Sequence, residues 1–270
     1  MSTEPAVGAL VTPAILTYNE APNIARALGG LTWAERVVVV DSGSCDGTEA
    51  IATRFRNVQW LVRPFDSHAR QWEFALRAAG AFSPYVLALD ADHQVPDAFV
   101  RELAAHFLGG DFAGGIAGFE YRIGGRALLG SVYPPRLVVV RADRVRVSQP
   151  GHTQELKVDG PIYRFRSRIV HDDRKSVDRF LRSQAEYSRL ELARLERAGP
   201  ARWRDRIRRA GLMPLAAGLV AYLRSGGPFR GAASLQYAYE RMLFECLLAL
   251  RVLREDSSPT AGPPSDRPST

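Results

Sequence analysis

Short apolar runs alternate with amphipathic segments through the first 110 residues of the chain. The apolar runs predict strands at 13–16, 36–40, 58–62 and 85–89, and the segments between and after them predict helices at 22–28, 49–55, 69–79 and 96–107. Strands that alternate with helices form a mostly parallel sheet with helices on both faces. The pattern therefore predicts an α/β fold.

Beyond residue 114 the pattern changes twice. Short strands are expected at 119–123, 136–140, 155–158 and 163–169, followed by long helices at 176–197 and 236–253 with an apolar stretch at 212–223 between them. The last residues are rich in Pro, Ser and Thr, a composition typical of disorder. We therefore expect a short lead-in over 1–10 within an α/β domain over 1–175, a helical appendage over 176–255 and a disordered tail over 256–270.

Two carboxylates end the fourth predicted strand. Asp90 and Asp92 are two residues apart, so on an extended backbone both point to one face. At the carboxyl end of a parallel strand, that face looks into the crevice where α/β proteins bind ligands. The two charges repel each other unless a cation or a proton lies between them. The pair therefore indicates a divalent-metal site, with a plain acidic turn as the alternative.

Polar loops also follow the first two predicted strands. Asn19 and Glu20 come after the first strand, and Asp41, Ser42 and Gly43 come after the second. The carboxyl ends of parallel strands meet at one edge of the sheet, so these loops should lie close to Asp90 and Asp92. Three acidic loops at one edge are more than a solvated surface requires, which favours a shared binding site.

Positive charge is concentrated in the second part of the chain. Residues 1–150 contain 14 Lys and Arg against 15 Asp and Glu, whereas residues 151–270 contain 22 against 14, and the formal net charge is +7. The excess indicates an anionic partner, although a general preference for arginine codons would produce the same count. The arginines accompany apolar helices without a recognisable nucleic-acid-binding module, so we expect no nucleic-acid partner.

The apolar stretch at 212–223 is too short to span a bilayer, but its arginine-rich flanks suit an interfacial helix. We therefore expect a peripheral contact with the anionic inner leaflet of a membrane. The chain has two cysteines, Cys45 and Cys246, far apart in sequence, and its N-terminus lacks a signal-peptide pattern. The expected location is the cytoplasm, at most peripheral on the cytoplasmic face of the membrane.

Three motifs together resemble a known family. Thr17-Tyr18-Asn19-Glu20, then Asp41-Ser42-Gly43-Ser44-Cys45-Asp46-Gly47-Thr48, then Leu89-Asp90-Ala91-Asp92 are similar to the motifs of family 2 glycosyltransferases with a GT-A, Rossmann-like fold. The match extends through about residue 110 and more loosely to 200. Trp33-Ala34-Glu35, the segment His152 to Glu155 and a single C-terminal helical region are most similar to the branch that acts on lipopolysaccharide core or lipid-linked acceptors.

The resemblance implies a role for each motif. The nucleotide sugar would be bound by Thr17, Asn19, Glu20, Asp41, Gly43, Gln71 and Asp90, and Asp92 would be the direct ligand of Mn²⁺ or Mg²⁺. In the family, the position of Asp41 hydrogen-bonds the base, and the position of Asp90 faces the ribose or a metal-bound water. Gly43 would let the backbone approach the nucleotide closely.

Enzymes of this family invert the anomeric centre by direct displacement, so a base must take the proton of the acceptor. Related sequences carry His–Glu or Glu–Asp at this point, whereas Thr153 and Gln154 separate His152 from Glu155 in this chain. Glu155 is the preferred base and His152 the alternative. The closest relatives also have a basic residue after the position of Gln71, where this chain has Trp72, and Arg70 is the candidate to supply that charge.

The predicted function is the metal-dependent, inverting transfer of a sugar from a nucleotide-sugar donor to a hydroxyl of a glycan or lipid-linked acceptor in cell-envelope biosynthesis. Two alternatives are a polyprenyl-phosphate glycosyltransferase, whose anionic acceptor needs no strong base, and a catalytically silent scaffold that binds nucleotide or glycan. A nucleotidyltransferase is disfavoured because residues 17–23 lack a Gly-rich basic loop. The cluster from His171 to Lys175 either holds metal or phosphate, or closes a loop through its own ion pairs.

Overall fold

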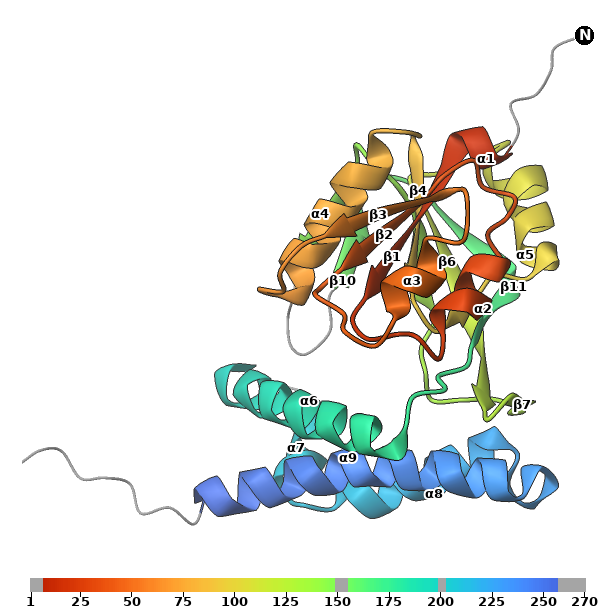
Figure 1. Ribbon diagram of the computed structural model, residues 1–270. Helices are drawn as coiled ribbons and strands as arrows, with labels where there is room; N and C mark the ends of the chain where they lie inside the picture. The colour runs from red at the N-terminus through yellow and green to blue at the C-terminus, as the bar shows by residue number, and fades with distance from the viewer. Residues whose placement is uncertain (1–6, 149–154, 199–202, 257–270) are drawn as a thin grey trace, which may run out of the picture.

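The protein is described by a computed structural model that covers residues 7–148, 155–198 and 203–256 (Figure 1). The strands of its main sheet are β1 Val11–Thr17, β2 Val37–Asp41, β3 Val58–Val62, β4 Tyr85–Asp90, β5 His93–Gln94, β6 Gly114–Ile123, β7 Arg126–Ala127, β8 Arg136–Arg141 and β11 Ile162–His171. They follow the order β3-β2-β1-β4-β8-β6-β11-β5, and β7 pairs with β6. A separate hairpin joins β9 Val145–Ser148 to β10 Glu155–Val158.

The first four strands are parallel to one another. β1, β2 and β4 are mostly apolar and buried on both faces, as central strands of a parallel sheet are, whereas the edge strand β3 is only partly buried. In the register of this sheet, Thr17 lies beside Asp41, and Leu16 lies beside Asp90. The loops after β1, β2 and β4 therefore leave the sheet at the same edge, as the sequence predicted.

Helices cover both faces of the sheet (Figure 1). They are α1 Val7–Leu10, α2 Ile24–Gly29, α3 Thr48–Ala52, α4 His68–Gly80 and α5 Asp97–Glu102, which continues into a π-helical turn, η1 Leu103–Phe107. On one face α4 packs Trp72 and Leu76 against Val38 and Val86. On the opposite face the helices contribute Ile24, Leu28, Phe99 and Phe107 to a second core. The predicted α/β layers are thus present.

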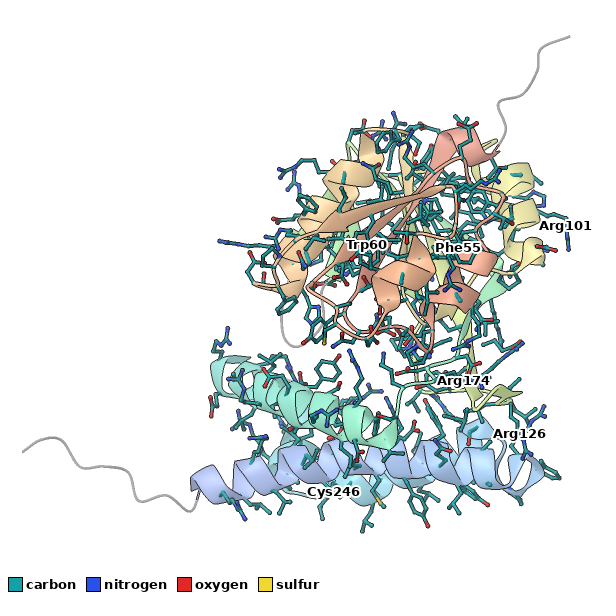
Figure 2. The ribbon with its side chains drawn as sticks, viewed as in Figure 1. Phe55, Trp60, Arg101, Arg126, Arg174 and Cys246 are labelled. Carbon is teal, nitrogen blue, oxygen red and sulfur yellow. The ribbon has the colours of Figure 1, made fainter. Side chains whose placement is uncertain are left out.

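Four further helices follow β11. They are α6 Val177–Ala198, α7 Trp203–Arg209, α8 Met213–Ser225 and α9 Ala232–Asp256, with a short 3-10 turn, η2 Gly227–Arg230, before the last. They form a layer beneath the carboxyl edge of the sheet, and the connection from β11 to α6 contains Arg174, labelled in Figure 2. Apolar contacts join α6 to α9 through Leu192, Leu195, Leu248 and Val252.

Several details differ from the sequence-based expectations. The lead-in includes a turn of helix, α1, because Gly8 packs closely against the backbone of Trp33 and Glu35. The two-residue strands β5 and β7 were not predicted, because a pair of residues has no periodicity to detect. Of the tail predicted over 256–270, Asp256 is the last residue of α9, and the rest lies outside the described residues.

Candidate functional site

A cavity of about 1610 Å³ lies between the carboxyl edge of the sheet and the helices α6 and α9. The loops after β1, β2 and β4 form one wall, and the ends of β6 and β11 form another. Such a volume exceeds the roughly 300–1,000 Å³ of a typical small-ligand pocket. The cavity is therefore larger than the pocket of a single small ligand.

The loops after β1 and β2 are locked together by Asn19. Asn19 has a φ of 53°, in the left-handed region that asparagine tolerates better than most residues. In this conformation its side-chain oxygen accepts a hydrogen bond from the backbone N–H of Cys45 at 2.7 Å, and its own N–H donates to the Ser44 hydroxyl at 2.7 Å. Gly43, in the same loop, has a φ of 94°, which requires glycine.

Asp41 organises the second loop from a buried position at the end of β2. One carboxylate oxygen accepts from the hydroxyls of Thr17 and Ser44, and the other accepts from the backbone N–H groups of Gly43 and Ser44. These four hydrogen bonds use the capacity of an ionised carboxylate. Asp41 is not among the residues that line the cavity, so contact with a nucleotide base stays a prediction.

Three side chains at the ends of β4, β5 and β11 form a cluster with metal-ligand spacing: Asp92, His93 and His171. The Nε2 atom of His171 lies 3.8 Å from Oδ2 of Asp92. This separation is too long for a hydrogen bond, but it is within the span of two ligands that each bind one ion at about 2.1 Å. Oδ1 of Asp92 and Nδ1 of His171 are buried without a hydrogen-bond partner among the described residues.

His93 differs from the other two members of this cluster. Its Nδ1 accepts the backbone N–H of Asp90 at 3.1 Å, so the proton of the neutral ring is on Nε2. Burial lowers the pKa of His93 and outweighs the attraction of the Asp90 and Asp92 carboxylates. Nε2 lies 3.7 Å from Asp90 and 3.8 Å from Asp92. A nitrogen that carries the proton cannot bind a metal, so Asp92 and His171 are the two members of the cluster that could hold one.

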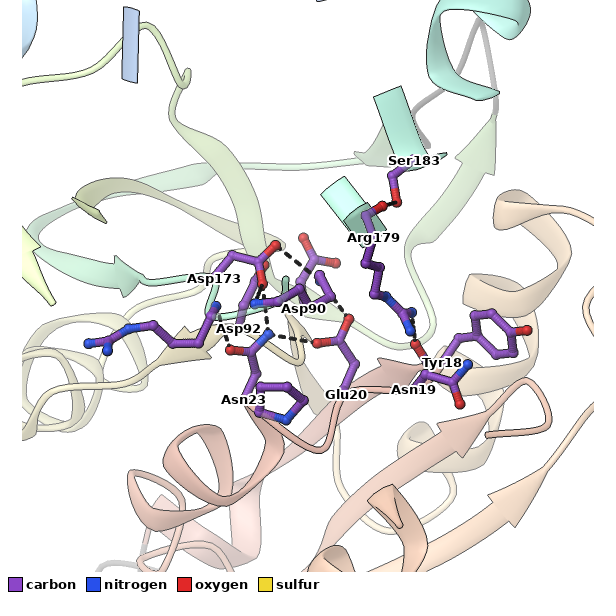
Figure 3. Close-up of polar contacts among 12 residues, drawn as sticks. Tyr18, Asn19, Glu20, Asn23, Asp90, Asp92, Asp173, Arg179 and Ser183 are labelled. Atoms are coloured by element: carbon purple, nitrogen blue, oxygen red, sulfur yellow. Dashed lines mark hydrogen bonds and ion pairs between the residues drawn. The ribbon is translucent and has the colours of Figure 1, made fainter. Parts of the chain in front are cut away.

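The segment after β11 holds the first loop through buried ion pairs (Figure 3). Lys175 donates to Glu20 at 2.8 Å and lies 3.2 Å from Asp173. Asn23 bridges the two carboxylates with hydrogen bonds of 2.8 Å to Glu20 and 2.9 Å to Asp173. Burial opposes the charge of Lys175, but the carboxylates of Asp92, Glu20 and Asp173 outweigh it and hold its pKa above the usual value. Lys175 thus brings a fixed positive charge into the cavity.

Two further contacts complete the cavity wall. Gln71 on α4 is buried, and its amide donates to the Ser42 hydroxyl at 2.8 Å and to the carbonyl of Arg63 at 3.0 Å. Arg136 lies 3.8 Å from Asp90 and over the ring of Tyr133. Arg70, by contrast, is exposed beside Asp66 and does not line the cavity.

The candidate bases lie elsewhere. Glu155 is the first residue of β10, and its side chain is 52% exposed and 3.3 Å from Lys157. It is not among the residues that line the cavity. His152 lies in 149–154, outside the described residues. The structure therefore brings together Thr17, Glu20, Gln71, Asp90 and Asp92, but does not bring Glu155 to them.

Sequence reasoning left two of these functional residues unassigned. The sequence left open whether the cluster from His171 to Lys175 holds metal or closes a loop. In the structure His171 faces Asp92, while Asp172 pairs with Arg26 and Arg174 and so closes the loop. His93 directly follows Asp92 in the sequence, and in the structure it is buried against both carboxylates. The sequence signal for this cluster was a histidine directly after the Asp-x-Asp motif. The sequence alone does not show that His171 lies beside that motif.

Comparison with known proteins identifies the family. Residues 14–168, more than half of the chain, match the family described as Glycosyl transferase family 2. The chain belongs to glycosyl transferase family 2. The resemblance drawn from the three motifs is confirmed, as is the prediction that the protein is an enzyme. The mostly parallel sheet with flanking and C-terminal helices confirms the expected GT-A fold class.

Individual relatives of this glycosyltransferase are distant. The lipopolysaccharide core biosynthesis glycosyltransferase LpsC of Rhizobium meliloti (strain 1021) is 32% identical over 98 residues, which is 35% of each protein. The chain thus matches about a third of the length of this curated relative. A crystal structure of S. aureus TarS 1-349 is 13% identical, with 93% of both chains covered and a TM-score of 0.46.

A second similar structure is glucosyl-3-phosphoglycerate synthase from Mycobacterium tuberculosis in complex with Mn²⁺, uridine diphosphate and phosphoglyceric acid. It is 15% identical to the glycosyltransferase, and the comparison covers 73% of this chain and 81% of that chain with a TM-score of 0.46.

Proposed function

We propose that this family 2 enzyme is an inverting, metal-dependent glycosyltransferase of cell-envelope biosynthesis. It would transfer a sugar from a nucleotide-sugar donor to a hydroxyl of a glycan or lipid-linked acceptor. The observation that carries the proposal is the pairing of Asp92 with His171 at the edge of one cavity, beside Thr17 and Glu20 of the predicted donor loop.

The side chains present fit a divalent metal ion. One carboxylate and one imidazole, both with buried atoms that lack a hydrogen-bond partner among the described residues, are a natural ligand pair for Mn²⁺. Mg²⁺ would bind more weakly, because imidazole is a poor ligand for it. When bound, the ion neutralises the charge that develops on the leaving diphosphate. Lys175 holds the neighbouring carboxylate of Glu20 in place.

The donor would lie along the wall formed by the loops after β1 and β2. Thr17, Gln71 and Asp90 line the cavity on this side and would contact the nucleotide. Asn19, Asp41 and Gly43 would act by shaping the loop, because their polar atoms already hold it together. Asp41 would reach a base only if it released one of its four hydrogen bonds.

The proton of the acceptor would be taken by Glu155, with His152 as the alternative. The motif supports this role, but the exposed position of Glu155 requires the hairpin of β9 and β10 to approach the acceptor. If neither residue is needed, the cavity offers Glu240 on α9. Unlike Glu20 and Asp173, Glu240 has no ion pair with a described lysine or arginine, and it accepts a hydrogen bond from Gln236 at 3.0 Å.

A lipid-linked acceptor is favoured by the opposite wall of the cavity. Val177 and Leu181 on α6 and Leu235 and Tyr239 on α9 line the cavity while exposing much of their apolar surface. An acceptor with a hydrocarbon segment would cover these side chains and stabilise the complex by removing them from water. This placement also supports a peripheral location on the cytoplasmic face of a membrane.

A polyprenyl phosphate is the second candidate acceptor. Four arginines, Arg122, Arg136, Arg179 and Arg241, line the same cavity and would suit a phosphate group. A phosphate oxygen is already ionised and needs no strong base. The position of Glu155 outside the cavity lining is compatible with this acceptor.

The proposal is tested by measuring thermal shifts of the full chain with a panel of nucleotide sugars, with and without Mn²⁺ or Mg²⁺. A bound donor raises the unfolding temperature by mass action. We expect one donor to give a shift that requires the metal, and we expect Asp92→Asn and His171→Ala each to remove the metal-dependent part.

Asp143→Asn is the matched control, because Asp143 is 65% exposed and pairs only with Arg141 among the described residues. It should leave the shift unchanged. A full metal-dependent shift in Asp92→Asn would contradict the metal assignment. The absence of any shift across the panel would contradict the donor assignment.

A further inference from the structure

Helix α8 is apolar around almost its whole circumference. Its sequence is MPLAAGLVAYLRS, with Arg224 as its one charged residue. One face, with Gly218, Ala221 and Ser225, is buried, and Gly218 packs close to Met242 of α9. A helix that is apolar on all sides is normally covered on all sides, by protein or by lipid. Here only one side is covered by the described residues.

The opposite face of α8 forms an exposed apolar stripe. Leu215, Leu219 and Leu223 follow one another at intervals of four residues and are 76%, 60% and 63% exposed. Leu212 and Val220 widen the stripe to both sides, at 66% and 44% exposed. Phe229 in η2, just beyond the end of α8, is 88% exposed. Isolated exposed leucines are ordinary, but a continuous stripe marks an interaction surface.

Arginines are frequent in the segments that flank this stripe. Residues 203–230 contain six arginines and one acidic residue, Asp205, which is buried in an ion pair with Arg194. Arg204, Arg224 and Arg230 are exposed and have no ion pair with any carboxylate of the described residues. The surface is therefore apolar along α8 and positive at its C-terminal end, where Arg224 and Arg230 lie.

We infer that the exposed face of α8 docks the enzyme on an anionic lipid bilayer. The inference specifies the surface for the peripheral contact that is part of the proposed function. A helix of 13 residues is about 20 Å long, so it can lie in the plane of the interface with its leucines among the acyl chains. The arginines then lie at the level of the anionic headgroups.

The structure also indicates how this surface would serve catalysis. None of the helices within 7–148, 155–198 and 203–256 has the length and apolar character needed to cross a bilayer. α9 packs on the buried face of α8 and lines the cavity with Leu235 and Tyr239. Packed helices are about 8–10 Å apart, so docking through α8 places the cavity roughly one helix above the membrane surface. A lipid-linked sugar can span that distance.

A second copy of the chain is a poorer occupant of this face. In a symmetric dimer the same patch of both subunits meets itself. Such a dimer would bring the unpaired arginines of both copies into one interface. Their repulsion is absent at an anionic bilayer, where the same charges are attracted.

The test is flotation of the full chain with vesicles of phosphatidylcholine alone or of phosphatidylcholine mixed with phosphatidylglycerol. We expect the wild-type protein to float with the mixed vesicles and to be released by salt. Leu215→Glu combined with Leu219→Glu should lower the bound fraction roughly ten-fold or more, because carboxylates enter the acyl region at a high cost. Arg224→Gln combined with Arg230→Gln should weaken binding to the mixed vesicles by a similar factor.

Matched controls lie on the sheet domain. Ile162→Glu changes an exposed apolar residue at the end of β11 farthest from His171, and Arg101→Gln changes an exposed arginine on the sheet domain, labelled in Figure 2. Both should float like the wild type. Donor-induced thermal shifts should be unchanged in all four variants. A variant that no longer floats but still binds the donor has lost docking alone, whereas loss of the donor-induced shift would concern the proposed function.

Three results would overturn the inference. The first is a wild-type protein that binds neither kind of vesicle, and the second is a leucine double variant that floats like the wild type. The third is a wild-type dimer in solution that Leu219→Glu converts to a monomer, which would make this face an interface between copies.

Discussion

At the scale of single residues, the site contains two kinds of side chain. Some hold its loops in place, and others keep polar atoms without a hydrogen-bond partner. Asp41 and Asn19 use their polar atoms on neighbouring loop groups. Asp92 and His171 instead retain buried atoms without a hydrogen-bond partner in the described parts of the chain. Unmade hydrogen bonds at buried polar atoms are costly, so the described parts of the chain leave both residues with unmet hydrogen-bonding capacity.

Glu155→Gln tests the base at this scale. The substitution keeps the size of the side chain but removes its ability to take a proton. If Glu155 is the base, we expect transfer to fall by about 10²–10⁴-fold while the donor-induced thermal shift is unchanged. Turnover assays with the acceptor measure the rate of transfer. Thermal unfolding with the donor measures the donor-induced shift.

Retained turnover in Glu155→Gln has two readings that a second measurement separates. If His152→Ala is also active with a hydroxyl acceptor, the base lies elsewhere, and Glu240→Gln is the next variant. If the active acceptor is a polyprenyl phosphate, none of these carboxylates should matter. Glu186→Gln serves as the control, because Glu186 is exposed, forms an ion pair with Arg189 at 2.6 Å and does not line the cavity.

At the scale of elements, β11 depends on a carboxylate from α5. The pairing of β11 with β6 shifts register between Arg164 and Arg168, which leaves backbone N–H groups without a strand partner. Glu102 accepts the N–H of Arg166 at 2.8 Å and the N–H of Ser167 at 2.7 Å. The bulge is therefore held in place from the adjacent helix, and β11 carries His171 at its end.

Glu102→Gln should destabilise the fold by about 1–3 kcal/mol at neutral pH, because two hydrogen bonds to a charged acceptor are weakened. Burial works against the charge of Glu102, but the N–H groups of Arg166 and Ser167 lower its pKa from the ordinary 4.5 to about 2. A lowered pKa stabilises the fold above pH 4.5, and the stabilisation is lost as the pH falls toward 2.

The difference in unfolding free energy between the wild type and Glu102→Gln should therefore be constant above about pH 5 and shrink as the pH falls below 4.5. Urea unfolding at a series of pH values measures it. Glu73→Gln, on the exposed face of α4, is the control and should show no such trend. A difference that does not change with pH would contradict the role given to the Glu102 charge.

At the scale of the whole molecule, the helical layer is held together by buried charges. Arg208 on α7 donates to Glu245 of α9 at 2.6 Å and to Glu191 of α6 at 2.7 Å. The two carboxylates are 9% and 6% exposed. This network fixes α6 and α9, which line one wall of the cavity, relative to each other and to α7.

Arg208→Met should destabilise the helical layer by about 3–5 kcal/mol, because the carboxylates of Glu191 and Glu245 lose a partner while they stay buried. Hydrogen exchange would report this as faster exchange in α6, α7 and α9 than in the sheet. Arg189→Met is the control, since Arg189 and its partner Glu186 are more than half exposed and should contribute less than about 1 kcal/mol. Equal effects of the two substitutions would contradict the importance of the buried network.

The sequence by itself determined the parts that depend on local patterns. Apolar runs and helical periodicity are encoded in neighbouring residues, so the layers of the α/β domain and the long helices α6 and α9 were predictable. The spacing of Asp90 and Asp92 likewise fixed their common position at the end of β4. Shorter elements such as β5 and α1 were missed, because they form only through contacts with distant segments.

Only the tertiary structure decided which distant side chains meet. It paired Asp92 with His171 and Glu20 with Lys175, because β4, β11 and the segment after β11 converge at one edge of the sheet. It placed Glu155 on an exposed hairpin, away from the cavity lining that its motif suggested. It also left one face of α8 exposed. Hydrophobic periodicity cannot show this, because the sequence does not say whether protein, lipid or water contacts an apolar side chain.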